Sequence, residues 1–220
     1  MNLPLGTRRV RLAAALAATL ASAAAGCSLL GKPVPDASRY FVLSLDGSSV
    51  AASAAKRSDV HFGIGPITLP NYLDAQSLVR TNDANAVEYL RDAYWAEPLS
   101  ASFPRVLLHH VSTRLGSMHG VAFPWYGTTR VDWRVPVDVL RFEATTAGKV
   151  VLVVRWKLER ASDGRLVAGG ESRFEEETGP DAAAVARGLG ACVDRLAATI
   201  ADAMAAQPKV AASPDAAGTR

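Results

Sequence analysis

A strict alternation of apolar and polar residues constrains the fold of this chain more than any other feature. The segment "VDWRVPVDV" at residues 131–139 places an apolar side chain at every second position. Because successive side chains of a β-strand point to opposite faces, this pattern predicts a strand with one buried and one solvated face. The segment "KVVLVVRWKLER" at 149–160 predicts a partner strand, with these residues facing the core: Val150, Leu152, Val154, Trp156 and Leu158.

Further strands follow from turn signals around short apolar runs. After an "SDG" turn, residues 165–177 predict the third strand of an antiparallel meander, in which Gly169 and Gly170 indicate a bulge or a close backbone approach. Residues 39–45 predict another strand, and 59–70 predict a bulged or edge strand. The segments 77–83 and 86–97 predict a hairpin that turns near residues 83–85.

Two amphipathic helices accompany the strands. The segment 181–206 follows Pro180 and carries apolar residues at three- and four-residue spacing, as does a segment that ends near Leu115. In the earlier helix, Pro104 predicts either a kink in a helix that begins at Pro98 or a start near Ser102. We therefore expect a single α+β domain, with two main helices packed on one largely antiparallel or mixed β-sheet.

The N-terminus predicts an export signal. Three arginines precede an uncharged apolar run from Leu12 to Ala25, which matches the layout of a secretory signal. The run has about 14 residues, whereas a membrane-spanning helix needs about 20. We divide the chain into a signal at 1–26, an acylated cysteine with a flexible tether at 27–38, a folded domain at 39–206 and a disordered tail at 207–220.

Cys27 is the predicted lipid attachment site. The residues Ala24, Ala25, Gly26 and Cys27 resemble a bacterial lipobox, after which the cysteine carries fatty acyl chains such as palmitate. Two or three such chains hold a protein stably on a bilayer. Ser28, in place of the aspartate that retains lipoproteins on the inner membrane, favours the periplasmic face of the outer membrane. The alternative is ordinary secretion after cleavage at a small-residue site.

Charge and cysteine content exclude some functions. The chain has 24 lysines and arginines against 21 aspartates and glutamates. Removal of the signal takes away three arginines and leaves a formally neutral chain, so nucleic acid is not an expected partner. Cys192 is the second of two cysteines, and it has no intramolecular disulfide partner if Cys27 is acylated.

No catalytic or cofactor motif emerges from the sequence. Nucleophile elbows, phosphate-binding glycine loops, zinc spacings and dinucleotide fingerprints are missing. Neighbours on a helix point about 100° apart, so His109 and His110 cannot share a metal, and we expect a solvated or partly packed pair. The acidic run at 175–177 is interpreted as a solvated strand end. We predict no catalytic residue, no metal ligand and no cofactor.

Aromatic and proline-marked loops are the remaining candidates for function. Such residues are either lids over the core or anchors that contact a partner, and the sequence alone favours lids. As a hypothesis, we assign partner binding to Tyr72, Trp95, Pro98, Phe123 and Trp125.

The same loops carry a family resemblance that extends over residues 40–204. The order of motifs resembles that of the ABC-type transport auxiliary lipoproteins, which include the lipoprotein of paraquat-inducible Mce (mammalian cell entry) systems. The motifs are "YFVLS", "GIGPITLPNYLDAQSLVRTND", "YWAEPLSASFPRVLLHHVSTRL", "FPW" and "VPVDVLRFE".

This resemblance implies a non-catalytic lipoprotein on the outer membrane that faces the periplasm. Its implied partners are an Mce-domain protein with its inner-membrane permease and ATPase, which move lipids or other hydrophobic molecules between the two membranes. The aromatic loops would bind that assembly or a neighbouring copy of the chain. Two alternatives stay open: a lipid carrier with its own acyl-chain cavity between sheet and helices, and an envelope hydrolase.

The acylation of Cys27 is directly testable. Cells that express the chain and grow with labelled palmitate should label the wild-type protein, while Cys27→Ala should take up no label because the acceptor thiol is gone. A Cys27→Ala protein that still carries label would contradict the assignment.

Overall fold

The computed structural model describes residues 36–46, 56–82, 86–127 and 129–208. The predicted signal, Cys27 and most of the tether lie outside these residues, as does nearly all of the predicted tail. The described chain forms an eight-stranded mixed sheet and two α-helices, which confirms the predicted α+β class. Within the described ranges, no helix is long and apolar enough to cross a membrane.

The three longest strands form the predicted meander. They are β6 (Trp133–Thr145), β7 (Lys149–Arg160) and β8 (Leu166–Glu177), and each pairs with the next in antiparallel register. The residues predicted to face the core on β7 are all buried. A Cβ atom added to Gly169, whose φ is +147°, would lie 2.5 Å from the carbonyl oxygen of Trp156. Gly169 therefore permits the close backbone approach that the sequence indicated.

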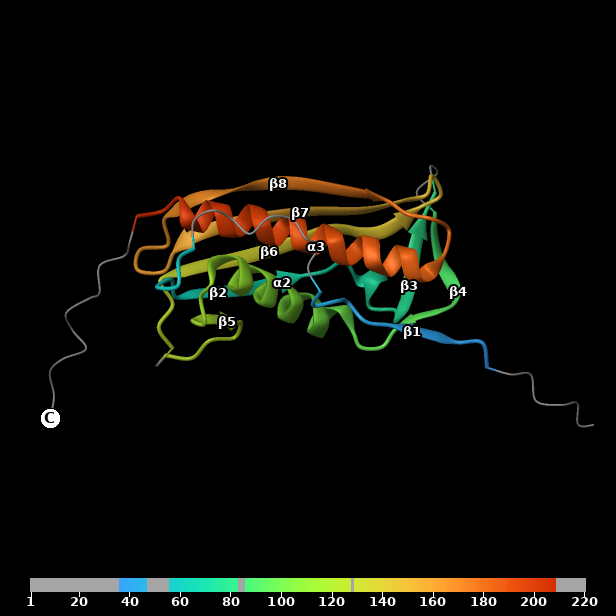
Figure 1. Cartoon of the computed structure of the whole chain (residues 1–220), viewed down its shortest axis with the longest axis horizontal. Helices are drawn as coiled ribbons and strands as arrows, with labels where there is room; N and C mark the ends of the chain where they lie inside the picture. The colour runs from blue at the N-terminus through green and yellow to red at the C-terminus, as the bar shows by residue number, and fades with distance from the viewer. Residues whose placement is uncertain (1–35, 47–55, 83–85, 128, 209–220) are drawn as a thin grey trace, which may run out of the picture. The chain divides into compact units, whose positions relative to one another are not determined.

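The remaining strands join the free edge of β6 in two groups. The first half of β6 pairs in parallel with β2 (Phe62–Thr68), which carries β5 (Gly120–Ala122) on its other side. The last residues of β6 pair in parallel with β3 (Ser77–Thr81). Next to β3 come β4 (Val87–Trp95) and β1 (Arg39–Phe41). The two groups thus lie toward opposite ends of one long strand (Figure 1).

Some predicted strands differ in detail from the observed ones. The hairpin of β3 and β4 is confirmed, but β1 has three residues rather than the seven of segment 39–45. The register of β2 shifts between Ile64 and Ile67, as expected for a bulge, yet β2 lies between β5 and β6 and is not an edge. Its prolines and glycines are tolerated because the bulge interrupts the ladder there.

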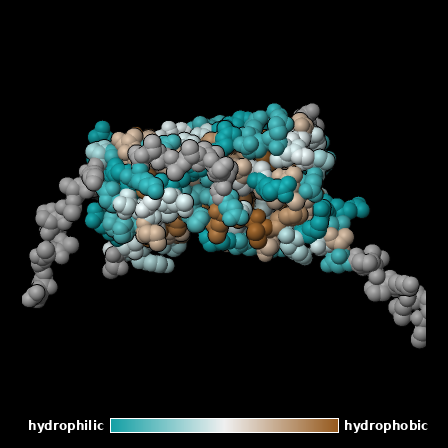
Figure 2. Space-filling model, in the orientation of Figure 1, coloured by the Kyte–Doolittle hydropathy of each residue, from teal (hydrophilic) through white to brown (hydrophobic). Residues whose placement is uncertain are grey.

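Both helices pack on one face of the sheet. They are α2 (Leu99–Leu115) and α3 (Ala182–Ala205), and Figure 1 shows them on the same side. The carboxylate of Asp181 caps α3 by accepting a hydrogen bond from the amide of Ala184 at 3.3 Å. The apolar stripes predicted for both helices are buried against the sheet. On the outside, Figure 2 shows mostly hydrophilic residues around small hydrophobic areas on this face.

The first helix, α2, begins directly after Pro98, as one of the two sequence alternatives predicted. Pro98 precedes the first helical residue, so the start near Ser102 is wrong, and Pro104 lies inside the helix. Pro104 offers no amide to the carbonyl four residues back, but that residue, Ser100, is exposed to water. Burial of Leu99 and Phe103 in the core offsets the lost hydrogen bond.

A buried ion pair joins the two helices. The guanidinium of Arg114 on α2 lies 2.7 Å from the carboxylate of Asp194 on α3, and both side chains are buried. His110 is 4% exposed and approaches the same carboxylate at 3.5 Å. Burial lowers the pKa of His110, against the opposing effect of Asp194. The predicted solvated or partly packed histidine pair is therefore wrong for His110, although His109 is exposed.

Removal of one partner of this pair should cost more than removal of both. Arg114→Met leaves the Asp194 carboxylate buried without its cation, and such a change costs about 3–5 kcal/mol of unfolding free energy. The double variant Arg114→Met with Asp194→Leu removes both charges of this pair and should recover most of that loss. Urea unfolding measures both values, and a double variant that is less stable than Arg114→Met alone would contradict the explanation.

Candidate functional site

The helix-free face of the sheet carries two of the loops that the sequence singled out. On β6, Phe142 and Ala144 are buried beneath the helices. Because side chains alternate along a strand, Arg141 and Glu143 point to the opposite face. Tyr72 contacts Glu143 on that face. Trp125 covers Gly63, which pairs with Arg134 of β6. The sheet therefore presents one packed face and one face that these loops partly cover.

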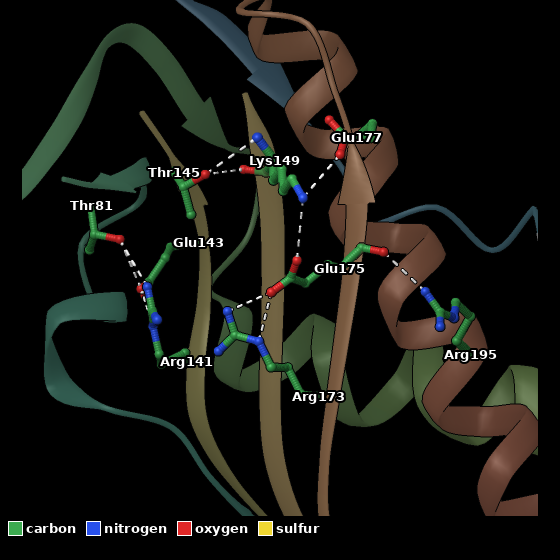
Figure 3. Close-up of polar contacts among 9 residues, drawn as sticks. All are labelled: Thr81, Arg141, Glu143, Thr145, Lys149, Arg173, Glu175, Glu177 and Arg195. Atoms are coloured by element: carbon green, nitrogen blue, oxygen red, sulfur yellow. Dashed lines mark hydrogen bonds and ion pairs between the residues drawn. The ribbon is translucent and has the colours of Figure 1, made fainter. Parts of the chain in front are cut away.

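Tyr72 takes part in a buried polar cluster. It lies on the short 3-10 helix η2 (Asn71–Leu73), and its hydroxyl donates to a carboxylate oxygen of Glu143. The other carboxylate oxygen accepts from Thr81 Oγ1 at 3.1 Å and from Arg141 Nε at 2.7 Å (Figure 3). Burial and the hydrogen bond to Glu143 raise the pKa of Tyr72, so this hydroxyl stays protonated and donates. Tyr72 acts as a lid that satisfies a buried carboxylate.

A ladder of ion pairs continues across β7 and β8 on the same face. Arg173 Nε donates to Glu175 at 2.7 Å, and Lys149 lies 3.1 Å from Glu177 and 3.7 Å from Glu175 (Figure 3). Hydrogen bonding and charge from Arg173, followed by Lys149, lower the pKa of Glu175. On the helix side, Arg195 of α3 pairs with Glu176 at 2.9 Å. The acidic run is thus matched by cations from both faces.

The aromatic loop, defined as residues 123–127, is held against β2 by two glycines. The rings of Phe123 and Trp125 meet edge to face, with centroids 5.1 Å apart. A Cβ atom on Gly63 would lie 2.7 Å from the Trp125 indole, and one on Gly65 would lie 2.7 Å from Phe123 Cβ. The amide of Phe123 donates to Ile64 O at 2.9 Å. The "GIGP" and "FPW" motifs therefore form one structural unit.

Two rings of this loop remain open to solvent. The Phe123 side chain is 50% exposed and Tyr126 is 74% exposed, while Trp125 is half-buried beneath them. Tyr126 was not among the predicted partner residues, although its position directly after Trp125 in "FPWY" was a usable signal. A fixed loop that exposes two aromatic rings has the form of a contact anchor.

The other predicted partner residues lie elsewhere. Trp95 is 3% exposed and stacks on Phe142 with ring centroids 6.4 Å apart. It is therefore a core residue, and its indole cannot reach a partner on the surface. Pro98 is exposed where α2 begins. Of the five predicted residues, Phe123 and Trp125 share one loop, whereas Tyr72 belongs to the buried polar cluster.

The histidines outside α2 form a stacked pair. The rings of His61 and His119 lie 4.2 Å apart, and burial, followed by the charge of His119, lowers the pKa of His61. Among the described residues, no group of three or more histidine, cysteine, aspartate or glutamate side chains is arranged to hold a metal ion. Cys192 is buried, and burial raises the pKa of its thiol to about 12.

The fit between Gly63 and Trp125 can be tested by fluorescence. Gly63→Val should displace the Trp125 indole into water, shift tryptophan emission to the red and cost about 1–3 kcal/mol of unfolding free energy. The other three tryptophans are at most 6% exposed, so the shift would report on Trp125. Gly127→Ala is the matched control because no atom lies within 4 Å of its added Cβ. Identical spectra for Gly63→Val and wild type would contradict the packing role.

A family model described as "ABC-type transport auxiliary lipoprotein component" matches residues 41–201. No curated protein matches the chain.

Two solved structures have the same fold. A crystal structure of an uncharacterized protein is 19% identical, covers 76% of this chain and 98% of its own, and has a TM-score of 0.60. A protein from Xanthomonas campestris of the family DUF330 is 16% identical, with coverages of 76% and 96% and a TM-score of 0.62. The family model covers most of the chain, and the protein therefore belongs to the ABC-type transport auxiliary lipoprotein family.

Proposed function

We propose that the protein is a non-catalytic docking component of an Mce-type ABC transport system. In this proposal, acyl chains on Cys27 hold the domain on the periplasmic face of the outer membrane. The aromatic loop binds the Mce-domain protein, whose inner-membrane permease and ATPase drive movement of lipids or other hydrophobic molecules. The family description, which names a lipoprotein and an auxiliary component of transport, supports this role.

The observation that carries the proposal is the position of the exposed aromatic loop. The loop lies beside the first half of β6 through its contacts with β2. The chain enters the domain at β1, whose group of strands pairs with the last residues of β6. Arg134, which pairs with Gly63 beneath the loop, and Ala144, which pairs with β3, are ten residues apart on β6, which corresponds to about 33 Å. A tether at one end leaves the loop at the other end free to meet a partner.

The chemistry of the loop suits protein docking. Full burial of a phenylalanine side chain contributes about 1.5–3 kcal/mol, and aromatic residues dominate the binding energy of many interfaces. The two glycines and the Phe123 backbone hydrogen bond hold the loop before a partner arrives. Binding then orders few additional groups, which favours affinity.

The lipid-carrier alternative has less support from the described residues. The space between the sheet and the helices is filled by buried side chains, and an acyl chain there would have to displace part of the core. The largest of these side chains include Trp133, Phe62, Phe103, Phe142 and Leu107.

Capture experiments test the docking role. Phe123→Ala with Tyr126→Ala in the full-length lipoprotein should reduce co-purification with the Mce protein about tenfold or more, because a lost hot spot of 1.4 kcal/mol or above changes affinity by that factor, as a rough estimate. Leu166→Ala is the matched control because Leu166 is an exposed apolar residue on β8, 57% exposed, and its capture should stay at the wild-type level.

The same proteins distinguish docking through the aromatic loop from a lipid-carrier function. Equal capture by the double variant and by Leu166→Ala, with unchanged unfolding curves, would remove the aromatic loop from the interface. Native mass spectrometry that finds lipid bound to the delipidated wild-type protein would favour the carrier instead.

A further inference from the structure

Four of the five tyrosines lie together on the helix-free face. Thr81 pairs with Thr145 of β6, so it shares a face with Glu143. Ser77 and Val79 of β3 are two and one alternations before Thr81, so they point to the same face as Thr81. On β4, Tyr94 pairs with Ser77 and Tyr89 pairs with Val79, which places both tyrosines on that face. Tyr40 of β1 pairs with Tyr94 in turn. We call this surface the tyrosine face, and it comprises Tyr40, Tyr72, Tyr89 and Tyr94.

The tyrosine face leaves large parts of its aromatic side chains exposed to solvent. Tyr40 is 64% exposed and Tyr89 is 52% exposed. The rings of Tyr40 and Tyr94 are 5.6 Å apart, and the Tyr89 hydroxyl donates to Tyr72 O at 3.4 Å. Exposed valines extend the surface at positions 42 and 87. The Tyr40 and Tyr94 rings contact each other and the Tyr89 hydroxyl bonds to the backbone, while Tyr40 and Tyr89 remain open to solvent.

The start of the folded chain places this face near the predicted anchor. Eleven residues separate Cys27 from Arg39, the first residue of β1. A fully extended segment of this length reaches about 40 Å at most. Tyr40 lies on β1 itself, so the tyrosine face lies at the end of the sheet where the predicted tether joins the domain.

Tyrosine suits the boundary between lipid and water. Its ring is apolar and its hydroxyl is polar, and tyrosines gather at the headgroup level of membranes for this reason. Arg91, an exposed cation on β4 between Tyr89 and Tyr94 in the sequence, can approach lipid phosphates. A short tether and open tyrosine rings together favour a bilayer surface over a protein partner at this face.

We propose that the tyrosine face rests on the headgroup region of the bilayer that carries the Cys27 anchor. This inference rests on the lipid anchor of the proposed function. It adds a position: the contact is made through β1, β3 and β4, and the aromatic loop lies farther along β6, beside the first half of that strand.

Hydroxyl-radical footprinting of the acylated full-length protein tests the contact. The protein is compared in detergent and in vesicles of phosphatidylethanolamine and phosphatidylglycerol, and oxidation of each tyrosine is read by mass spectrometry. Oxidation of Tyr40 and Tyr89 should fall several-fold on vesicles. Tyr126 of the aromatic loop, which is 74% exposed, is the internal control and should keep its reactivity.

Two results would overturn the inference. One is equal oxidation of Tyr40, Tyr89 and Tyr126 on vesicles. The other is protection of Tyr40 and Tyr89 that appears without vesicles and rises with protein concentration, which would assign the face to a second copy of the chain.

Failure of the anchor is distinguishable from failure of the contact. If the protein does not float with vesicles, Cys27 can be coupled to a maleimide lipid, since Cys192 is buried with a raised thiol pKa of about 12. The same footprint then decides the contact independently of acylation. Tyr94, whose ring contacts that of Tyr40, should also be protected on vesicles in the wild type. It should lose that protection in an acylated Tyr40→Ser, Tyr89→Ser variant, whereas Tyr126→Ser should leave it unchanged.

Discussion

The pairing of β6 organises the rest of the structure. One edge of this strand pairs with β7 along its length, while the other edge is divided between β2 and β3. The division places the aromatic loop and the tyrosine face toward opposite ends of a single rigid strand. β6 is hydrogen-bonded along both edges, with one register shift between Val139 and Arg141, so the length of this strand sets the separation between the two surfaces. Any role that links an anchor to a distant partner can rely on this fixed spacing.

The motifs that carry the family resemblance complement one another in space. The glycines of "GIGP" accept Trp125 and Phe123, and Tyr72 of "LPNYLD" donates to Glu143 of "VLRFE". These contacts are made on the helix-free face, outside the core beneath the helices. The explanation is steric in one case and electrostatic in the other: a side chain at Gly63 would collide with the indole, and the buried carboxylate of Glu143 needs donors.

Much of the fold could be predicted from local patterns. Alternation gave the strands of the meander, and the spacing of apolar residues gave both helices, because burial of one face leaves a periodic record in the sequence. The burial of Trp95 and that of His110 escaped prediction for a common reason. A loop aromatic or a helix histidine can be open or buried, and the choice depends on which segments pack over it. Phe142 covers Trp95, and Asp194, more than 80 residues from His110 in the chain, lies against that histidine.

The sequence by itself determined the α+β class, the meander, the two helices and the family, because each depends on local periodicity or on motifs in order. The tertiary structure alone decided which aromatic residues are available. It buried Trp95, turned Tyr72 into a lid for Glu143, left Phe123 and Tyr126 open, and gathered tyrosines from β1, β4 and η2 on one face. Exposure depends on pairing between strands far apart in the chain, and a sequence pattern carries no record of that pairing.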